Sequence, residues 1–377
     1  MKYIIIIIIG WVVPALLISC SDSRITMSGL DAEKFVTNLG NKTTGLYVLK
    51  NKDMEVCITN YGGRIVSIMV PDKDGIMRDV VLGFSSINDY LDNPSSLGAT
   101  IGRVANRIKS GNFILDDKEY SLPKNSAGHC IHGGYQGFQY KVFDVKVINE
   151  NRLVMTYVSP DGEEGFPGNL KCEITMLLTD NNSIDISYRA TTDKPTVVNM
   201  TNHSFFNLDG DASVDINDYK LWVNADCYTP IDSTLITTGE IVPVSNTPLD
   251  FTKSERIGDI IDSDNQQLNL AKGIDHNFVL NHYGDISKES AIVYSEKTGI
   301  MLSVYTNEPG LQVYTSNSLD GKFKGKGNVF YHSRCGICLE TQHYPDSPNK
   351  IHWPSVVLRP GEEYYSRCIY KFSVINN

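Results

Sequence analysis

The sequence lacks a basic stripe and a cysteine framework, and each absence excludes a class of protein. Its 34 lysines and arginines are outnumbered by 44 aspartates and glutamates, and the net charge of -10 is spread along the chain. Proteins that bind nucleic acid neutralise phosphates with clustered cations, so no nucleic-acid partner is expected. Of the eight cysteines, Cys20 belongs to an N-terminal signal. The other seven are odd in number and have no framework spacing, which argues against a disulfide scaffold.

Helical periodicity, internal repeats and low-complexity linkers are also missing between Leu46 and Phe372. Short runs that alternate apolar and polar residues fill this stretch, and Gly, Pro, Asn and Asp separate them. Only residues 89–97 and 254–261 are expected to form short helical turns. The pattern predicts an all-β fold in one domain, a large antiparallel sandwich. Strands are expected at 54–60, 64–70, 142–147, 153–158, 174–178, 184–188 and 292–294.

The N-terminus carries the one long apolar run, residues 4–18, which has the length of a signal-peptide core. It ends in L-I-S-C, which resembles the lipobox of bacterial lipoproteins, where a peptidase cuts before an acylated cysteine. We expect residues 1–19 to be a lipoprotein signal peptide and Cys20 to be acylated. A plain secretory signal and an uncleaved anchor are the alternatives. Residues 20–41 would then form a tether to a catalytic domain at 42–377, in a periplasmic or outer-membrane-attached protein of the cell envelope.

One predicted strand carries a carboxylate among apolar residues. Residues 334–342 read R-C-G-I-C-L-E-T-Q, with the two-residue period of a strand. A buried carboxylate loses its hydration, so Glu340 is expected at a cleft or beside a cation. Cys335 and Cys338 would point to opposite faces, which is poor geometry for a shared metal ion. We expect both cysteines to be buried as small apolar residues.

A second predicted strand, residues 197–208, has one unusually polar face. That face carries amide, hydroxyl, imidazole and aromatic groups, which differs from both a core and a plain solvated surface. Amides bind sugar hydroxyls and an aromatic ring packs against the C–H face of a sugar, so this face is typical of a carbohydrate site. Its residues are Asn199, Thr201, His203, Phe205 and Asn207.

Several other polar residues are candidates for a binding site only when they are taken together. Arg107 has several donors that could clamp hydroxyls. His132 precedes two glycines, which let the backbone approach a ligand closely. Asp275 and Gln312 each lie on one face of a predicted strand, and alone each is more often structural. The spacing of His129 and His132 suggests metal, but no Asp or Glu lies near them in the sequence, so no metal site is expected.

These segments together resemble the aldose 1-epimerase (galactose mutarotase) family over some 330 residues, from Leu46 to the C-terminus. The resemblance implies a single-domain β-supersandwich with a shallow cleft. It also implies a cofactor-free interconversion of the α and β anomers of free aldoses such as glucose and galactose. Phe206 stands where many members have Tyr, and residues 350–355 also depart from the family pattern. The motifs, in order, are N-Y-G-G at 60–63, G-R-V-A-N-R-I at 102–108, H-G-G at 132–134, T-N-H-S-F-F-N-L at 201–208, D-H-N-F at 275–278, E-P-G-L-Q-V-Y-T at 308–315, L-E-T-Q-H-Y-P-D at 339–346 and L-R-P-G-E-E-Y at 358–364.

The resemblance also assigns roles. Glu340 matches the catalytic base, His203 the catalytic acid and His132 a second active-site histidine. We expect Glu340 to be ionised and His203 to be cationic together, because opposite charges favour each other's charged forms. Activity should then rise as Glu340 ionises and fall as His203 loses its proton. The residues that match sugar-holding positions are Asn106, Arg107, Asp275 and Gln312.

The expected partners are a free monosaccharide and, through the lipid, a membrane. The chain is expected to be a monomer, and no cofactor is expected, although an adventitious calcium ion is left open. Three other functions remain as alternatives. A glycoside hydrolase with Asp275 and Glu340 as its carboxylate pair would leave the histidines without a task. A hexose-phosphate epimerase would need more cations than Arg107, and a sugar-binding module would not need both His203 and Glu340.

Overall fold

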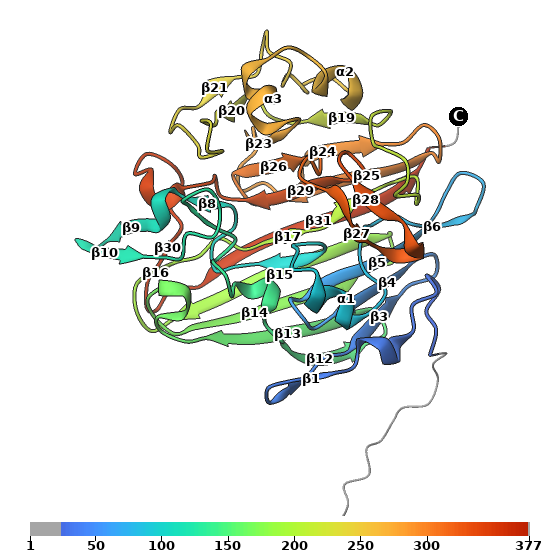
Figure 1. The fold of residues 1–377 in the computed structure, drawn as a ribbon, viewed down its shortest axis with the longest axis horizontal. Helices are drawn as coiled ribbons and strands as arrows, with labels where there is room; N and C mark the ends of the chain where they lie inside the picture. Colours follow the sequence, from blue (N-terminus) through green and yellow to red (C-terminus); the bar gives the residue numbers. More distant parts are fainter. Residues whose placement is uncertain (1–23, 376–377) are drawn as a thin grey trace, which may run out of the picture.

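A computed structural model describes residues 24–375, so the expected signal peptide and Cys20 lie outside the described residues. Three sheets make up most of the fold, and the strands of the sheets pack in two layers (Figure 1). Every pairing between named strands of the described residues is antiparallel, including the first hairpin, β1–β2, and the pairing of β25 with the C-terminal strand β31. The all-β supersandwich expected from the sequence is therefore confirmed.

The largest sheet has nine strands, and alternation of buried and exposed residues marks its long strands. In β14 the side chains alternate strictly between the core and the other face, as the sequence pattern predicted. In sheet order the strands are β12 (Asp144–Asn149), β13 (Arg152–Ser159), β14 (Leu170–Leu178), β15 (Ser183–Thr192), β31 (Tyr364–Val374), β25 (Ile300–Thr306), β24 (Glu289–Tyr294), β19 (Lys220–Val223) and β22 (Glu255–Arg256).

The second layer is divided between a six-stranded and a four-stranded sheet. The six-stranded sheet runs β18 (Phe205–Phe206), β29 (Ile337–Gln342), β26 (Gly310–Tyr314), β23 (Asp275–Val279), β20 (Cys227–Thr229) and β21 (Val242–Pro243). The four-stranded sheet runs β3 (Leu46–Lys50), β4 (Glu55–Thr59), β5 (Arg64–Pro71) and β6 (Met77–Asp79).

Short strand pairs and helices fill the edges. The expected turns at 89–97 and 254–261 correspond to α1 (Ile87–Asp92) and α2 (Ile257–Ile261), and α3 (Gln266–Ala271) was not expected. Six residues are too few to show a helical period. The pairs are β1 (Asn38–Leu39) with β2 (Lys42–Thr43), β7 (Ala99–Ile101) with β17 (Thr201–His203), β8 (Arg107–Ile108) with β11 (Cys130–Ile131), β9 (Asn112–Leu115) with β10 (Lys118–Ser121), β16 (Thr196–Val197) with β30 (Val357–Leu358), and β27 (Asp320–Lys324) with β28 (Phe330–His332).

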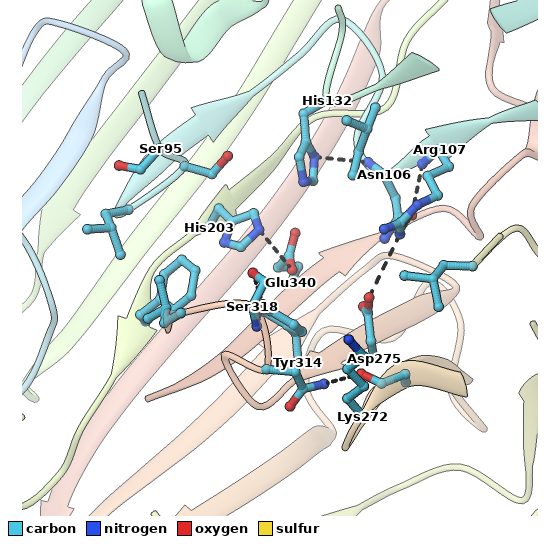
Figure 2. Close-up of a pocket in the computed structure, with 18 of the residues that line it drawn as sticks. Ser95, Asn106, Arg107, His132, His203, Lys272, Asp275, Tyr314, Ser318 and Glu340 are labelled. Carbon is cyan, nitrogen blue, oxygen red and sulfur yellow. Dashed lines mark hydrogen bonds and ion pairs between the residues drawn. The ribbon is translucent and has the colours of Figure 1, made fainter. Parts of the chain in front are cut away.

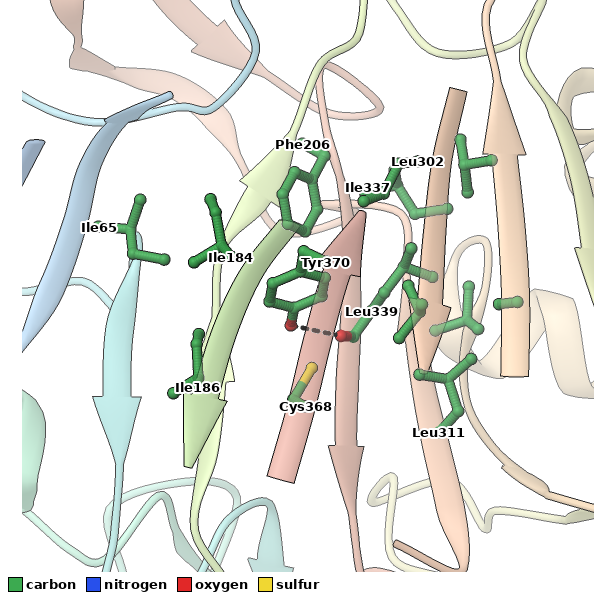
Figure 3. Close-up of a cluster of buried hydrophobic side chains, with 14 of the residues drawn as sticks. Ile65, Ile184, Ile186, Phe206, Leu302, Leu311, Ile337, Leu339, Cys368 and Tyr370 are labelled. Carbon is green, nitrogen blue, oxygen red and sulfur yellow. Dashed lines mark hydrogen bonds between the residues drawn. The ribbon is translucent and has the colours of Figure 1, made fainter. Parts of the chain in front are cut away.

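The main core lies between the two layers (Figure 3). Side chains of the nine-stranded sheet pack there against side chains of β5, β18, β26 and β29. Burial of each such side chain contributes about 1.5–3 kcal/mol, so this seam supplies much of the stability. The labelled members are Ile184, Ile186, Leu302, Cys368 and Tyr370 from the first layer, and Ile65, Phe206, Leu311, Ile337 and Leu339 from the second.

The segment from residue 24 to residue 41 packs on the domain, which corrects the expectation of a tether in this range. It contains a short 3-10 helix, η1 (Ala32–Phe35), and the Phe35 ring is fully buried. The Met27 N–H donates to the buried Glu55 carboxylate at 2.6 Å. A buried aromatic ring contributes a large apolar area to the core. The Phe35 ring therefore anchors to the domain a segment that is mostly polar in sequence. Among residues 24–375, no helix combines the length and the apolar character needed to cross a bilayer.

Candidate active site

Glu340 lies on β29, whose residues are all buried. Ile337 and Leu339 face the main core, where the Tyr370 hydroxyl donates to the Leu339 carbonyl at 2.8 Å. Side chains alternate along a strand, so Cys338 and Glu340 point to the opposite face. Glu340 lines a cavity there, as the sequence predicted for a carboxylate on an apolar strand.

His203 lines the same cavity, although the expected strand at 197–208 is interrupted. β17 pairs with β7, whereas β18 pairs with β29. His203 and Phe205 both line the cavity, with rings stacked at 5.0 Å between centroids. The expected polar floor is only partly present. Asn199 bonds the backbone of residue 343, and Asn207 donates to the carbonyls of residues 214 and 335.

The catalytic candidates meet at His203 (Figure 2). Its Nε2 lies 3.5 Å from Glu340 Oε1, and its Nδ1 lies 3.5 Å from Cys338 Sγ. The His132 ring packs edge-on against it, with centroids 5.1 Å apart. Glu340 and His203 are 1% and 5% exposed, and the second carboxyl oxygen of Glu340 has no partner among the described residues. That oxygen is itself buried, so its hydrogen-bonding capacity is unused within the described residues.

A loop with strained backbone holds His132. Asn106 and His132 both have positive φ angles, 58° and 52°, which non-glycine residues rarely adopt. The Asn106 N–H donates to His132 Nδ1 at 3.2 Å, and the His132 N–H donates to the Asn106 carbonyl at 3.1 Å. A Cβ on Gly133 would lie 2.0 Å from the Gly102 carbonyl oxygen. Only glycine therefore fits after the histidine, as the H-G-G motif suggested.

Arg107, Asp275 and Gln312 form a chain of polar contacts at the other end of the cavity. Arg107 Nη1 lies 3.8 Å from Asp275 Oδ2, and Gln312 Nε2 donates to Asp275 Oδ1 at 2.6 Å. Arg107 and Asp275 line the cavity, whereas Gln312 does not. Gln312, expected to hold sugar hydroxyls itself, lies behind Asp275 and fixes its carboxylate.

The cavity has a volume of about 460 Å³, within the roughly 300–1,000 Å³ of small-molecule sites. Loops that the sequence did not single out complete its wall. Lys272, for example, follows α3 and has a left-handed backbone conformation. The pattern of apolar residues in the sequence does not reveal such a conformation. These further lining residues include Ser95, Ser96, Leu235, Lys272, Asn317, Ser318 and Phe323.

Burial favours the uncharged form of each catalytic candidate, whereas the sequence led us to expect both in their charged forms. It raises the pKa of Glu340 well above its usual range; the nearby Asp275 adds to this and Arg107 opposes it. Burial lowers the pKa of His203 to about 4 and lowers that of His132 well below its usual value. Loss of hydration thus outweighs the mutual attraction expected from the sequence. The site favours a neutral carboxyl beside a neutral imidazole.

One group of side chains resembles a metal site. His203, Cys338 and Glu340 have donor atoms within 4.8 Å of one another. However, the sulfur and the carboxylate approach different ring nitrogens, which point away from each other, so one cation cannot use all three well. His129 is also engaged elsewhere: Ser110 N–H donates to its Nδ1 at 2.9 Å. Cys335 and Cys338 are buried, as expected.

Comparisons with known proteins agree with this geometry. Residues 45–371 match the family described as aldose 1-epimerase. Human galactose mutarotase is 43% identical over 338 residues, which cover 89% of this chain and 96% of that protein. Aldose 1-epimerase of Escherichia coli K12 is 39% identical over 329 residues, covering 87% and 94%. The crystal structure of an aldose epimerase homologue from C. elegans aligns with a TM-score of 0.82 at 31% identity, covering 88% of this chain and all of that one. The chain belongs to the aldose 1-epimerase family.

Proposed function

We propose that this protein is an aldose 1-epimerase that interconverts the α and β anomers of free aldohexoses such as glucose and galactose. The observation that carries the proposal is the contact of His203 Nε2 with Glu340 Oε1, 3.5 Å apart, on the wall of a cavity of small-molecule size. Family membership supports it, since galactose mutarotase and aldose 1-epimerase are relatives at about 40% identity.

Ring opening moves two protons. The C1 hydroxyl loses its proton to Glu340 while the ring oxygen gains one from His203, and the bond between C1 and the ring oxygen breaks to give the open aldehyde. Rotation about C1–C2 presents the other face of the carbonyl. The ring oxygen then attacks that face, and the two protons return by the reverse transfers. No bond to the enzyme forms, and no electrons are gained or lost.

The buried pair can supply these protons without changing its charge. A neutral carboxyl and a neutral imidazole hold the same number of protons as a carboxylate and an imidazolium. Moving one proton from Glu340 Oε1 to His203 Nε2 therefore produces the base and the acid together. A protonated Glu340 faces Nε2 as a donor, so the neutral His203 ring carries its proton on Nδ1, toward Cys338.

Asp275, Arg107 and Asn106 have a different proposed role, which is to hold the sugar. Asp275 accepts and Arg107 donates hydrogen bonds, so together they match hydroxyl groups, which do both. Gln312 keeps Asp275 in place, and His132 is proposed to line the reacting face beside His203. We propose that the reaction needs no metal or cofactor, and activity should survive dialysis against a chelator.

Polarimetry with freshly dissolved α-glucose and α-galactose tests the function. The protein should speed the change in rotation well beyond the spontaneous rate. Glu340→Gln should lower kcat by about 10²–10⁴, the usual contribution of one proton-transfer group, with an unchanged circular dichroism spectrum. Near-normal exchange in this variant would overturn the mechanism. Release of product from an aryl glycoside by the wild type would instead favour the hydrolase alternative.

We further propose that Cys20 carries lipid and attaches the enzyme to the cell envelope as a periplasmic or outer-membrane lipoprotein. The support is the apolar run at residues 4–18 and the L-I-S-C sequence that follows. The full-length protein should enter the detergent phase on phase separation, and Cys20→Ala should remain aqueous. Equal partitioning of the two would end this proposal. We expect a monomer, which sedimentation of a variant beginning at residue 24 would check.

A further inference from the structure

The sheet around Glu340 carries buried polar atoms that no described residue satisfies. Six such atoms belong to five side chains, and each of these residues is at most 2% exposed. We call this group the polar cluster. Apart from Glu340, none of its members lines the catalytic cavity. The six atoms are Thr201 Oγ1, Asn277 Oδ1, Gln312 Oε1, Glu340 Oε2, Gln342 Oε1 and Gln342 Nε2.

Strand register brings these side chains together. Gln312 stands directly opposite Glu340, and Asn277 stands directly opposite Gln312. Residues that are directly opposite in a sheet point to the same face, so these three form one row across β29, β26 and β23. Gln342 is two residues beyond Glu340 on β29 and therefore lies on the same face.

A glycine brings the outer members of the cluster close to each other. Gly310 stands opposite Gln342 on β26. A Cβ at Gly310 would lie 2.4 Å from Asn277 Oδ1, so the Asn277 amide occupies the space over this glycine, beside Gln342. Thr201 comes from β17, the strand of His203, which packs against β29. The members of the cluster therefore face one buried region next to the catalytic carboxyl.

The polar cluster has fewer donors than acceptors. Its three amide oxygens and the Glu340 oxygen accept hydrogen bonds, whereas only the Thr201 hydroxyl and the Gln342 amide nitrogen donate them. Within the described part of the chain, neither donor is bonded to an acceptor. A polar atom that is buried without a partner costs more free energy than an ordinary hydrogen bond gains. A buried water makes about three hydrogen bonds to such atoms, so water would supply the missing donors.

We propose that the polar cluster binds an internal water that donates to Glu340 Oε2, and that Gln342 positions the catalytic carboxyl by holding this water. The proposal rests on the function proposed above and adds a positioning residue to it. Side chains two residues apart on one strand face begin about 6.6 Å apart, and one bridging water spans about 5.5 Å. Gln342 can therefore reach Glu340 through a water. With Oε2 held in this way, Oε1 stays directed at His203.

The water would also act on the charge of Glu340. A donor to the carboxylate stabilises the ionised form and so lowers its pKa. Loss of the water should therefore raise the pKa of Glu340 further and make the ionised, catalytic form harder to reach. A substitution at Gln342 leaves in place the titratable groups around this carboxyl, which are Arg107, His132, His203, Asp275, Cys338 and Tyr370.

The variant Gln342→Met tests the positioning role by polarimetry. Methionine has a similar length but no amide, so it cannot hold the water. For freshly dissolved α-glucose, kcat should fall about tenfold, the contribution of one hydrogen bond to a charged group. KM should stay within about twofold, because Gln342 does not line the catalytic cavity. The alkaline limb of the pH profile should move upward by about one pH unit, which corresponds to the same tenfold change.

Crystallography tests the water itself. A high-resolution structure of the wild type should show a water within hydrogen-bond distance of both Glu340 Oε2 and the Gln342 amide. The structure of Gln342→Met should lack this water and should otherwise keep the backbone of β29 unchanged.

Thr341→Val is the matched control. Thr341 lies between Glu340 and Gln342 and is equally buried, at 1% exposure, but its side chain is on the opposite face of β29. This variant should leave both kcat and the alkaline limb unchanged. If Gln342→Met folds poorly, Thr201→Val and Thr201→Ser form a second pair. Val removes the hydroxyl and should change kcat and the limb in the same directions, whereas Ser keeps the hydroxyl and should resemble the wild type.

The possible failures are distinguishable. Absence of catalysis by the wild type would defeat the proposed function, and the crystal structure would still decide whether the water is bound. A wild-type crystal in which the amides bond directly to one another, with no water at Glu340 Oε2, would overturn the water site. A lower kcat in Gln342→Met with an unmoved alkaline limb would show a merely structural role, and an unchanged kcat would show no role at all.

Discussion

At the scale of single residues, the surroundings of His203 and Glu340 decide the pH range of the enzyme. Both are buried, and burial penalises whichever form is charged. The pKa of the carboxyl rises and that of the imidazole falls to about 4. The identity of the two residues could be predicted from the T-N-H-S and L-E-T-Q motifs. Their charges could not, because hydration depends on what covers them.

The pH profile follows from these directions. The catalytically competent pair of Glu340 and His203 holds one titratable proton between the two residues. Below about pH 4 His203 takes up a second, no base remains, and the rate should fall. When the pH rises through the elevated pKa of Glu340, the pair loses its last proton, no acid remains, and the rate should fall again. Measuring kcat/KM by polarimetry should show a plateau that begins above about pH 4 and ends at the raised pKa of Glu340.

The opposite assignment makes a different profile. If Glu340 and His203 had ordinary pKa values, the rate would rise near pH 4.3 and fall near about 6.5. Nuclear magnetic resonance of the histidine ring protons separates the two cases. A titration of His203 near 6.5 would contradict the charges derived from the structure.

Cys338 is expected to position His203. Its sulfur lies 3.5 Å from Nδ1, and burial raises its pKa well above the usual thiol range. It is therefore a neutral thiol, a weak acceptor for the Nδ1 proton. Cys338→Ala should lower kcat about three- to tenfold with KM unchanged, the size of one lost hydrogen bond. Cys338→Ser keeps an acceptor and should restore most of the rate. If Cys338 only filled space, the Ala and Ser variants would have similar rates.

At the scale of elements, the segment G-R-V-A-N-R-I shows how one motif divides its work. Its second arginine, Arg107, lines the catalytic cavity. Its first, Arg103, points into the interior on the other side, where it is 2% exposed. Arg103 donates to the carbonyls of Ser159, Pro160 and Pro167 at 2.8–3.0 Å. The sequence did not single out this arginine, because nothing local distinguishes a buried arginine from an exposed one.

Arg103→Met should destabilise the fold strongly. Methionine fills similar space but leaves several buried carbonyls without donors, and each costs about 1–3 kcal/mol. The free energy of unfolding in urea should fall by about 3 kcal/mol or more. Arg152→Met, on the exposed side of β13, is the control and should change it by less than about 0.5 kcal/mol. Equal stability of the two variants would show that the Arg103 contacts contribute little.

At the scale of the whole molecule, the N-terminal segment is part of the catalytic domain. Phe35 and Leu30 belong to the same buried cluster as Leu97 and Phe205, which line the active site. An attached lipid at Cys20 would therefore be separated from the folded domain by only a few residues. The start of the folded domain at residue 24 would then stay close to the membrane surface, since n residues span at most about 3.6 Å × n.

Phe35→Ala tests the contribution of this segment. Removal of a buried ring usually costs about 3–5 kcal/mol, and thermal unfolding should begin at a lower temperature. The neighbouring Val36 is 57% exposed, so Val36→Ala should be nearly neutral. A small effect of Phe35→Ala would mean that residues 24–41 behave as the tether expected from the sequence.

The sequence by itself determined the fold class, and it predicted the positions of several strands and the catalytic candidates. Alternation and ordered motifs are local properties, and they survive in the chain without any knowledge of packing. Only the tertiary structure decided that Gln312 supports Asp275 and that Asn199 and Asn207 bond the backbone. These features depend on which side chains pack together and shield one another from water. The side chains that pack together are far apart along the chain, so the local sequence does not reveal them.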